Sequence, residues 1–136
     1  MSLILQAIIF LVLALAVYAM LKHSYVKHAT LMGVGIVLHT VSIFLIMVPS
    51  LLSMVNPSSH LLVNLLTGFA LLVVTHATVG SLVEIMGIWL VATWLPSRAG
   101  VEKCFKRKNV MRVTIALWLL ELILGIYIYK MLYLAA

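Results

Sequence analysis

The stretch LILQAIIFLVLALAVYAML at residues 3–21 decides the fold, because this long apolar run contains only one strongly polar side chain, that of Gln6. A helix of about 20 apolar residues is long enough to cross the hydrocarbon core of a bilayer, which is roughly 30 Å thick. Three further apolar stretches follow, at about 28–54, 61–94 and 110–134. We therefore predict an all-α, integral membrane four-helix bundle that forms a single transmembrane domain over residues 1–136.

The composition points to the same class of protein. Hydrophobic residues make up 65% of the chain and charged residues 9%, whereas soluble domains carry about 25% charged residues. The chain thus has too few charges to cover a water-facing surface. Its net charge of +6 does not indicate nucleic-acid binding, because the positive charges lie in loops and at helix ends, as orientation in a membrane requires. We find no catalytic motif, and electron transfer is the most enzyme-like activity we expect.

The distribution of basic residues predicts the orientation of the bundle. Lys22 and Lys27 follow the first stretch, and a larger group precedes the last one: Arg98, Lys103, Lys106, Arg107, Lys108 and Arg112. The connection between the second and third stretches carries no charge. By the positive-inside rule, the first and third loops face the cytoplasm and both termini face outside. We expect a multi-pass protein of the plasma membrane.

Three ionisable residues lie near the middle of their stretches: His39, His76 and Glu121. Counting about 1.5 Å per residue places them at similar depth. Ionisable groups inside a membrane are costly, so a layer contributed by three helices is a candidate functional site. His28 and Glu84 lie closer to the cytoplasm, and we expect them to form a polar path towards this layer.

Glycines accompany these polar residues. Gly80 and Gly87 share the helix face of His76, and Gly125 lies one turn beyond Glu121. Small residues in membranes usually let helices approach closely. The alternative is that they leave room for a flat cofactor.

A haem b is the first cofactor that the histidines suggest. Imidazoles from two helices can bind iron on both faces of a haem, and His39 and His76 suit this role. Glu121 would then act as a nearby proton partner, Gly80 would make room for the ring, and His28 is a further conceivable ligand.

Two other interpretations stay open. His39 and His76, with Glu121 or Glu84, suit zinc or ferrous iron, whereas copper(I) prefers thioethers such as those of Met32, Met86 or Met111. Without a cofactor, Glu121 would be protonated or paired with a histidine and hold the bundle together. A proton or metal conduit would use Glu84, His76 and Glu121.

Two more residues have simpler interpretations. Cys104 is the only cysteine, so the chain cannot form an internal disulfide, and its basic loop predicts a reduced cytosolic thiol. His60 follows the uncharged outer loop and is expected at the surface.

Several motifs support a family resemblance: KHATLM at 27–32, THATVG at 75–80, LW at 117–118, GIY at 125–127 and MLY at 131–133. In them the chain resembles a family of small four-helix membrane proteins that includes the haem-copper oxidase maturation factor CtaM. The resemblance implies functional weight for His28 and His76, and a role in handling haem or assembling a terminal oxidase. Where the family has a His-Arg-Lys-like stretch before the last helix, residues 106–108 are Lys-Arg-Lys, without a histidine.

The prediction for function is a membrane haem b-binding protein for electron transfer or haem handling. A cofactor-free or metal-binding assembly factor for a haem-copper terminal oxidase is the alternative, and a proton or metal conduit is the second alternative. Expected partners are the lipid bilayer, terminal oxidase subunits or a quinone, and a second copy of the chain packed through its small residues.

Overall fold

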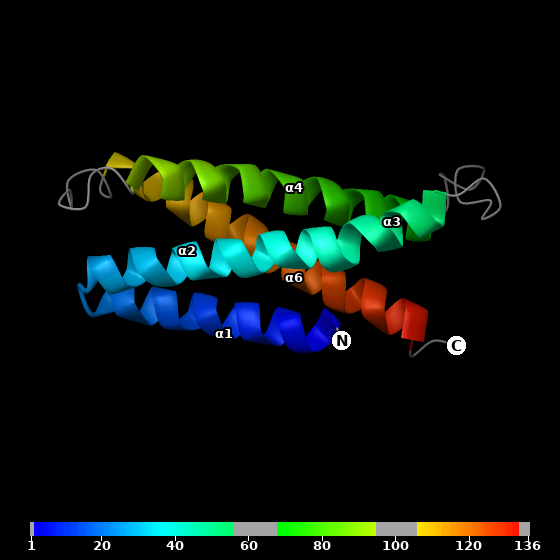
Figure 1. The fold of residues 1–136 in the computed structure, drawn as a ribbon, viewed down its shortest axis with the longest axis horizontal. Helices are drawn as coiled ribbons and strands as arrows, with labels where there is room; N and C mark the ends of the chain where they lie inside the picture. Colours follow the sequence, from blue (N-terminus) through cyan, green and yellow to red (C-terminus); the bar gives the residue numbers. More distant parts are fainter. Residues whose placement is uncertain (1, 56–67, 95–105, 134–136) are drawn as a thin grey trace.

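The structure is a computed structural model, which describes residues 2–55, 68–94 and 106–133, and these residues fold into long helices (Figure 1). The elements are α1 (Ser2–Leu21), α2 (Tyr25–Ser42), a π-helical segment η1 (Ile43–Met47), α3 (Val48–Val55), α4 (Gly68–Trp94) and α6 (Lys108–Tyr133). Because α2, η1 and α3 run on without a break, the described residues form four helical spans, each long and apolar enough to cross a membrane. The predicted all-α, multi-pass membrane fold is confirmed.

The helices run alternately up and down the bundle. α1 lies along α2, α4 lies along α6, and α2 contacts α4 (Figure 1). The turn between α1 and α2 lies at one end of the bundle, α6 ends at the other, and α1 begins partway towards that second end (Figure 1). The orientation of these ends relative to the cytoplasm remains a prediction.

A tight turn reverses the chain between α1 and α2. The N–H of Ser24 donates to the carbonyl oxygen of Ala19 at 2.9 Å, and His23 takes a φ of 56°. This left-handed residue just after the helix satisfies carbonyl groups that the helix end would leave unpaired. The short turn therefore holds α1 and α2 as antiparallel neighbours.

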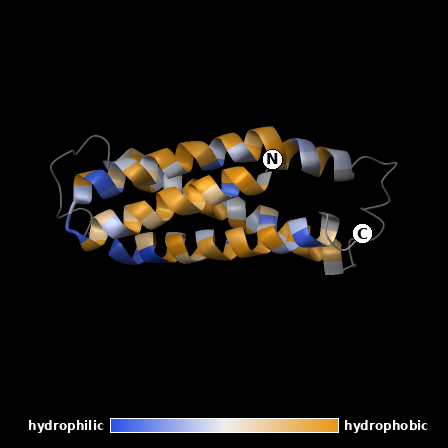
Figure 2. Cartoon of the chain, turned by 90° about the horizontal axis from the view of Figure 1, so that it is seen from below, coloured by the Kyte–Doolittle hydropathy of each residue, from blue (hydrophilic) through white to orange (hydrophobic). Residues whose placement is uncertain are grey.

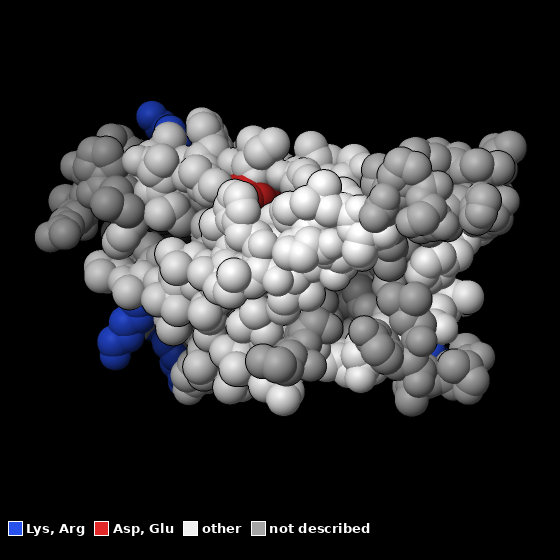
Figure 3. All heavy atoms as spheres, turned by 45° about the vertical axis from the view of Figure 1, so that its right-hand side comes forward, with Lys and Arg blue, Asp and Glu red and all other residues white. Residues whose placement is uncertain are grey.

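A small apolar core lies where the four spans meet. Its centre is the fully buried ring of Trp118 on α6, surrounded by Ile9 and Leu13 of α1, Ile36 of α2, Val83 of α4 and Leu122 of α6. Most other large apolar side chains point outward, and apolar residues cover the middle of the helices in Figure 2. On the face shown in Figure 3, the basic side chains lie towards the ends of the bundle. Such a surface suits a lipid environment.

The π-helical segment η1 precedes a proline. Pro49 has no N–H for the carbonyl group of Leu45, and its ring would clash with that group in a regular α-helix. A wider turn relieves the clash, and the N–H of Val48 bonds instead to the carbonyl oxygen of Ile43. The second span therefore changes its hydrogen-bond register just beyond His39.

The predicted helix limits agree closely with the structure where it describes them. The first stretch matches α1, the second begins three residues earlier than predicted, at Tyr25, and the last begins at Lys108 rather than 110. Residues 61–67, predicted to open the third helix, lie outside the described residues, as do His60 and Cys104.

Candidate buried carboxylate–imidazole site

The imidazole of His39 lies between two carboxyl groups in the middle of the bundle. Its Nδ1 is 2.8 Å from Oε2 of Glu84 on α4, and its Nε2 is 3.0 Å from each carboxyl oxygen of Glu121 on α6. His39 and Glu121 are both buried, with 4% of each residue exposed. Three helices thus contribute one side chain each to a cluster that we call the triad: His39, Glu84 and Glu121.

Two neighbours fix the geometry of the triad. The hydroxyl of Thr40 hydrogen-bonds to Oε1 of Glu84, the carboxyl oxygen that His39 does not contact. The ring of Trp118 lies 5.3 Å from that of His39, between centroids, and is tilted by 59°. The indole limits rotation of the imidazole because it fills the space beside it.

The number of hydrogen atoms constrains the charge of the triad. A neutral imidazole has one N–H donor and one acceptor nitrogen, and an ionised carboxylate only accepts. Both contacts of His39 are hydrogen bonds only if the ring is an imidazolium between two carboxylates, or if one carboxyl group is protonated beside a neutral ring. The two forms contain the same number of protons and differ in the position of one.

Gly80 allows the carboxyl group of Glu121 to approach α4. A methyl group added at Gly80 would lie 3.1 Å from Oε1 of Glu121, closer than carbon and oxygen normally pack. In this structure the space next to the glycine is filled by a side chain of the protein. The observation favours the close-approach interpretation of Gly80 over space for a flat cofactor.

His76 of α4 lies next to this cluster, where it meets Gly125 of α6. Its Cε1 would be 3.2 Å from a methyl group added at Gly125, which follows Glu121 by four residues, and the side-chain amide of Gln6 meets the same point. Among the described residues, Nδ1 of His76 is buried without a hydrogen-bond partner. His76 is thus a neighbour of the triad rather than one of its hydrogen-bonded members.

The structure brings together part of the predicted layer of His39, His76 and Glu121. His39 and Glu121 meet, as expected from their depth. Glu84 was expected nearer the cytoplasm, in a path with His28, but it bonds directly to His39. This contact places Glu84 at the depth of His39, about two helical turns along α4 from His76. The depth prediction had counted from the centre of a longer stretch.

The polar path between His28 and Glu84 is interrupted, so this prediction is wrong for the described residues. Met32 and Ile36 lie between them along α2 and line an apolar pocket with His28. The imidazole of His28 turns instead towards α1, where its Nδ1 is 2.8 Å from the carbonyl oxygen of Ala16.

Three residues of the site were not predicted as functional: Thr40, Trp118 and Gln6. Gln6 had a visible signal, because it is the strongly polar residue of an otherwise apolar span. Trp118 lies in the LW motif that supports the family resemblance, but that motif did not indicate a place beside His39. Thr40 had no signal, since hydroxyl residues are common in membrane helices.

The geometry bears on the proposed cofactors. Both ring nitrogens of His39 face carboxyl groups, so iron would have to replace Glu121 at Nε2 or Glu84 at Nδ1. Over residues 2–55, 68–94 and 106–133, no three or more His, Cys, Asp and Glu side chains are grouped so as to hold a metal ion. Haem b, zinc and iron at His39 and His76 stay predictions.

Comparison with known proteins adds no assignment. No protein-family model, no curated protein and no solved structure matches the chain. The resemblance to the CtaM-containing family, and the oxidase-assembly role that it implies, stay predictions.

Proposed function

We propose that this protein passes protons within the membrane, using Glu84, His39 and Glu121 as a relay. The observation that carries the proposal is the imidazole with a carboxyl group on each ring nitrogen, at 2.8 Å and 3.0 Å. Ionisable residues inside a membrane commonly mark proton relays made of Asp, Glu and His.

The relay works through the two nitrogens of one ring. A protonated Glu84 gives its proton to Nδ1, and the imidazolium that forms gives the proton on Nε2 to Glu121. One proton has then moved from one carboxyl group to the other, and each contact is still a hydrogen bond. Before the next proton passes, Glu121 gives up its proton and the ring turns over past Trp118, so that an N–H again faces Glu121.

The exposure of the carboxyl groups gives the relay a direction. The side chain of Glu84 is 13% exposed and that of Glu121 is 5% exposed. Glu84 therefore lies nearer the surface of the bundle, and Glu121 lies nearer its centre. Among the described residues, His76 of α4, beside Gly125, is the next titratable group towards the end of the bundle where α6 finishes.

Proton flux into liposomes tests the proposal. Purified protein is reconstituted with a pH-sensitive dye inside the vesicles, and a potassium gradient with valinomycin sets the membrane potential. We expect Glu84→Gln to lower the flux about 100-fold, the scale on which a positioned proton-transfer group contributes. Glutamine keeps the shape and hydrogen-bonding atoms of glutamate but cannot carry the proton.

Ser42→Ala is the matched control, because Ser42 is buried on the same helix, three residues after His39, and 7% exposed. We expect its flux to equal that of the unaltered protein. Equal flux in Glu84→Gln and Ser42→Ala, or no flux above empty liposomes, would contradict the relay.

The same purified samples test the haem prediction. Protein produced with sufficient haem should show a Soret band that changes on reduction with dithionite, if His39 and His76 bind iron. A spectrum without this band, together with proton flux that depends on Glu84, favours the relay over the haem protein.

A further inference from the structure

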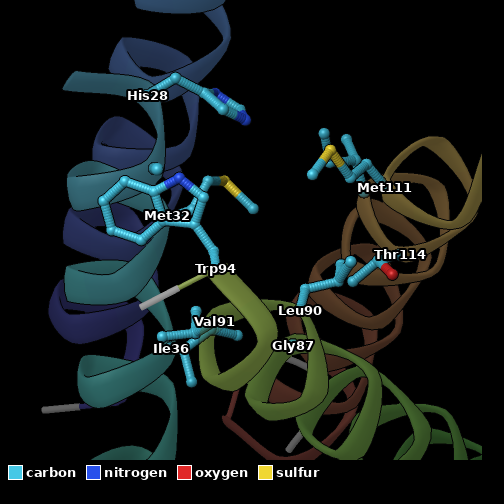
Figure 4. Close-up of a pocket in the computed structure, with 11 residues that line it drawn as sticks. His28, Met32, Ile36, Gly87, Leu90, Val91, Trp94, Met111 and Thr114 are labelled. Atoms are coloured by element: carbon cyan, nitrogen blue, oxygen red, sulfur yellow. The ribbon is translucent and has the colours of Figure 1, made fainter. Parts of the chain in front are cut away.

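A pocket lies between α2, α4 and α6, towards the end of the bundle where α1 turns into α2 (Figure 4). Its walls are mostly apolar, formed by residues such as Ile36, Leu90 and Val91. Three of its lining residues carry atoms able to bind a soft metal ion: His28, Met32 and Met111. Figure 4 shows both sulfur atoms on the pocket side of their helices.

His28 is held in one tautomer. Its Nδ1 lies 2.8 Å from the carbonyl oxygen of Ala16, and a carbonyl group only accepts, so Nδ1 carries the hydrogen. In the neutral ring Nε2 is then left with a lone pair, and within the described part of the chain no hydrogen-bond partner meets it. Histidines that bind metals almost always donate their other N–H in this way.

The two thioethers reach the pocket from different helices. Met32 follows His28 by four residues on α2, so the two side chains lie one above the other on one face. Met111 comes from the first turn of α6, on the opposite side of the pocket in Figure 4. Unbranched, flexible methionine side chains let both sulfur atoms adjust to one small ligand.

The charge and softness of these donors select the ion. Thioether sulfur favours copper(I), whereas zinc takes imidazole together with thiolate or carboxylate ligands, and magnesium and calcium take oxygen ligands. Among the residues that the structure describes, no carboxylate lines the pocket. A neutral ligand set in an apolar wall also favours one positive charge over two, because the cost of burying an ion rises steeply with its charge.

We propose that His28, Met32 and Met111 bind a copper(I) ion in this pocket. Nε2 of His28 and the sulfur atoms of Met32 and Met111 supply three neutral donors, and the indole of Trp94 forms a wall that tolerates a cation. The site is separate from the triad, because Ile36 lies directly against Gly87 between the two. The proposal does not depend on the proton relay.

Anaerobic titration with copper(I) against a coloured copper(I) chelator tests the site in the purified, full-length protein. We expect one ion per chain. Met32→Leu and Met111→Leu should each weaken binding about 10- to 100-fold, the range seen when a supporting group of a metal site is removed. Leucine keeps the apolar volume of methionine and removes the sulfur, so these variants should fold.

Met20→Leu is the matched control, because Met20 lies on α1, is 38% exposed and does not line the pocket. Its affinity should be unchanged, and so should that of Cys104→Ser. X-ray absorption at the copper edge should show sulfur neighbours that disappear in the Met32→Leu, Met111→Leu double variant.

Three results would overturn the proposal. Copper(I) affinity that is the same in the double variant and in Met20→Leu would mean that the methionines only fill space. Affinity lost in Cys104→Ser would place the ion on the loop thiol. Zinc(II) binding as tight as copper(I) would exclude a site built on soft, neutral donors.

Discussion

The triad and the pocket are built on the same three helices, yet they differ in whether their polar atoms have hydrogen-bond partners. In the triad every nitrogen of His39 and every carboxyl oxygen of Glu84 has a partner within the protein. In the pocket Nδ1 of His28 contacts the carbonyl oxygen of Ala16, while Nε2 has no hydrogen-bond partner among the described residues. The first arrangement suits the exchange of a proton between fixed groups, and the second suits the capture of a ligand.

The triad and the pocket lie at different heights along α2 and α4. From His28 to His39 is about three helical turns, and the side chains between them on the pocket side are those of Met32 and Ile36. Because Ile36 rests against Gly87, an apolar layer lies between the carboxyl groups and the pocket. The following substitutions test whether the two regions are as different as their geometry indicates.

Loss of a carboxyl group from the triad should have the largest effect on stability. Glu121→Ala leaves Nε2 of the buried His39 without a partner, and breaking a buried ion pair on one side costs about 3–5 kcal/mol. Unfolding with SDS in mixed micelles measures the change in free energy. Glu121→Gln should lose less, since an amide still hydrogen-bonds to the ring. Equal losses for both variants would contradict an essential hydrogen bond at this position.

A methyl group at Gly80 of α4, next to Glu121, should lower the free energy of unfolding by an intermediate amount. In Gly80→Ala the new carbon would lie 3.1 Å from Oε1 of Glu121, and overpacking of this kind costs about 1–3 kcal/mol. Gly33→Ala on α2 is the control, because nothing lies within 4 Å of its added methyl group. If the two variants unfold at the same SDS concentration, Glu121 does not rest against Gly80.

The smallest effect should come from the apolar layer between the triad and the pocket. It is a coupling between substitutions at Gly87 and Ile36 in the free energy of unfolding. A methyl group at Gly87 would collide with the end of the Ile36 side chain, and Ile36→Val removes the terminal carbon of that chain. We expect the double variant to regain about 1 kcal/mol relative to the sum of the single changes, the scale of coupling between contacting residues. Additive free energies of unfolding would show that Ile36 does not separate the pocket from the triad.

Sequence alone was sufficient to predict the four helices, because each one is an apolar run long enough to cross a bilayer. The limits of α1 and α6 follow from where polar and basic residues begin, near Leu21 and Lys108. The π-helical segment was not predicted, although Pro49 marks its place. Its geometry depends on how the chain accommodates one missing N–H.

The candidate site was predictable in its members but not in its contacts. His39, Glu84 and Glu121 stand out because charged or titratable groups are rare in such spans. Which of them touch depends on the axial shift and rotation of α4 relative to α2, and these are set by packing at points such as Gly80 against Glu121. For the same reason Glu84 was placed at the wrong depth relative to His39, whereas iron binding by His39 and His76 stays a prediction.

Infrared spectroscopy of protein in lipid, recorded as the difference between acidic and neutral pH, tests the central claim most directly. The chain contains only three acidic side chains, so few carboxyl groups contribute to the protonated C=O band. We expect a band that shifts in deuterated water, is altered by Glu84→Gln and by Glu121→Gln, and persists in Glu102→Gln. A band that disappears in Glu102→Gln and is unchanged in both triad variants would contradict a proton held between Glu84, His39 and Glu121.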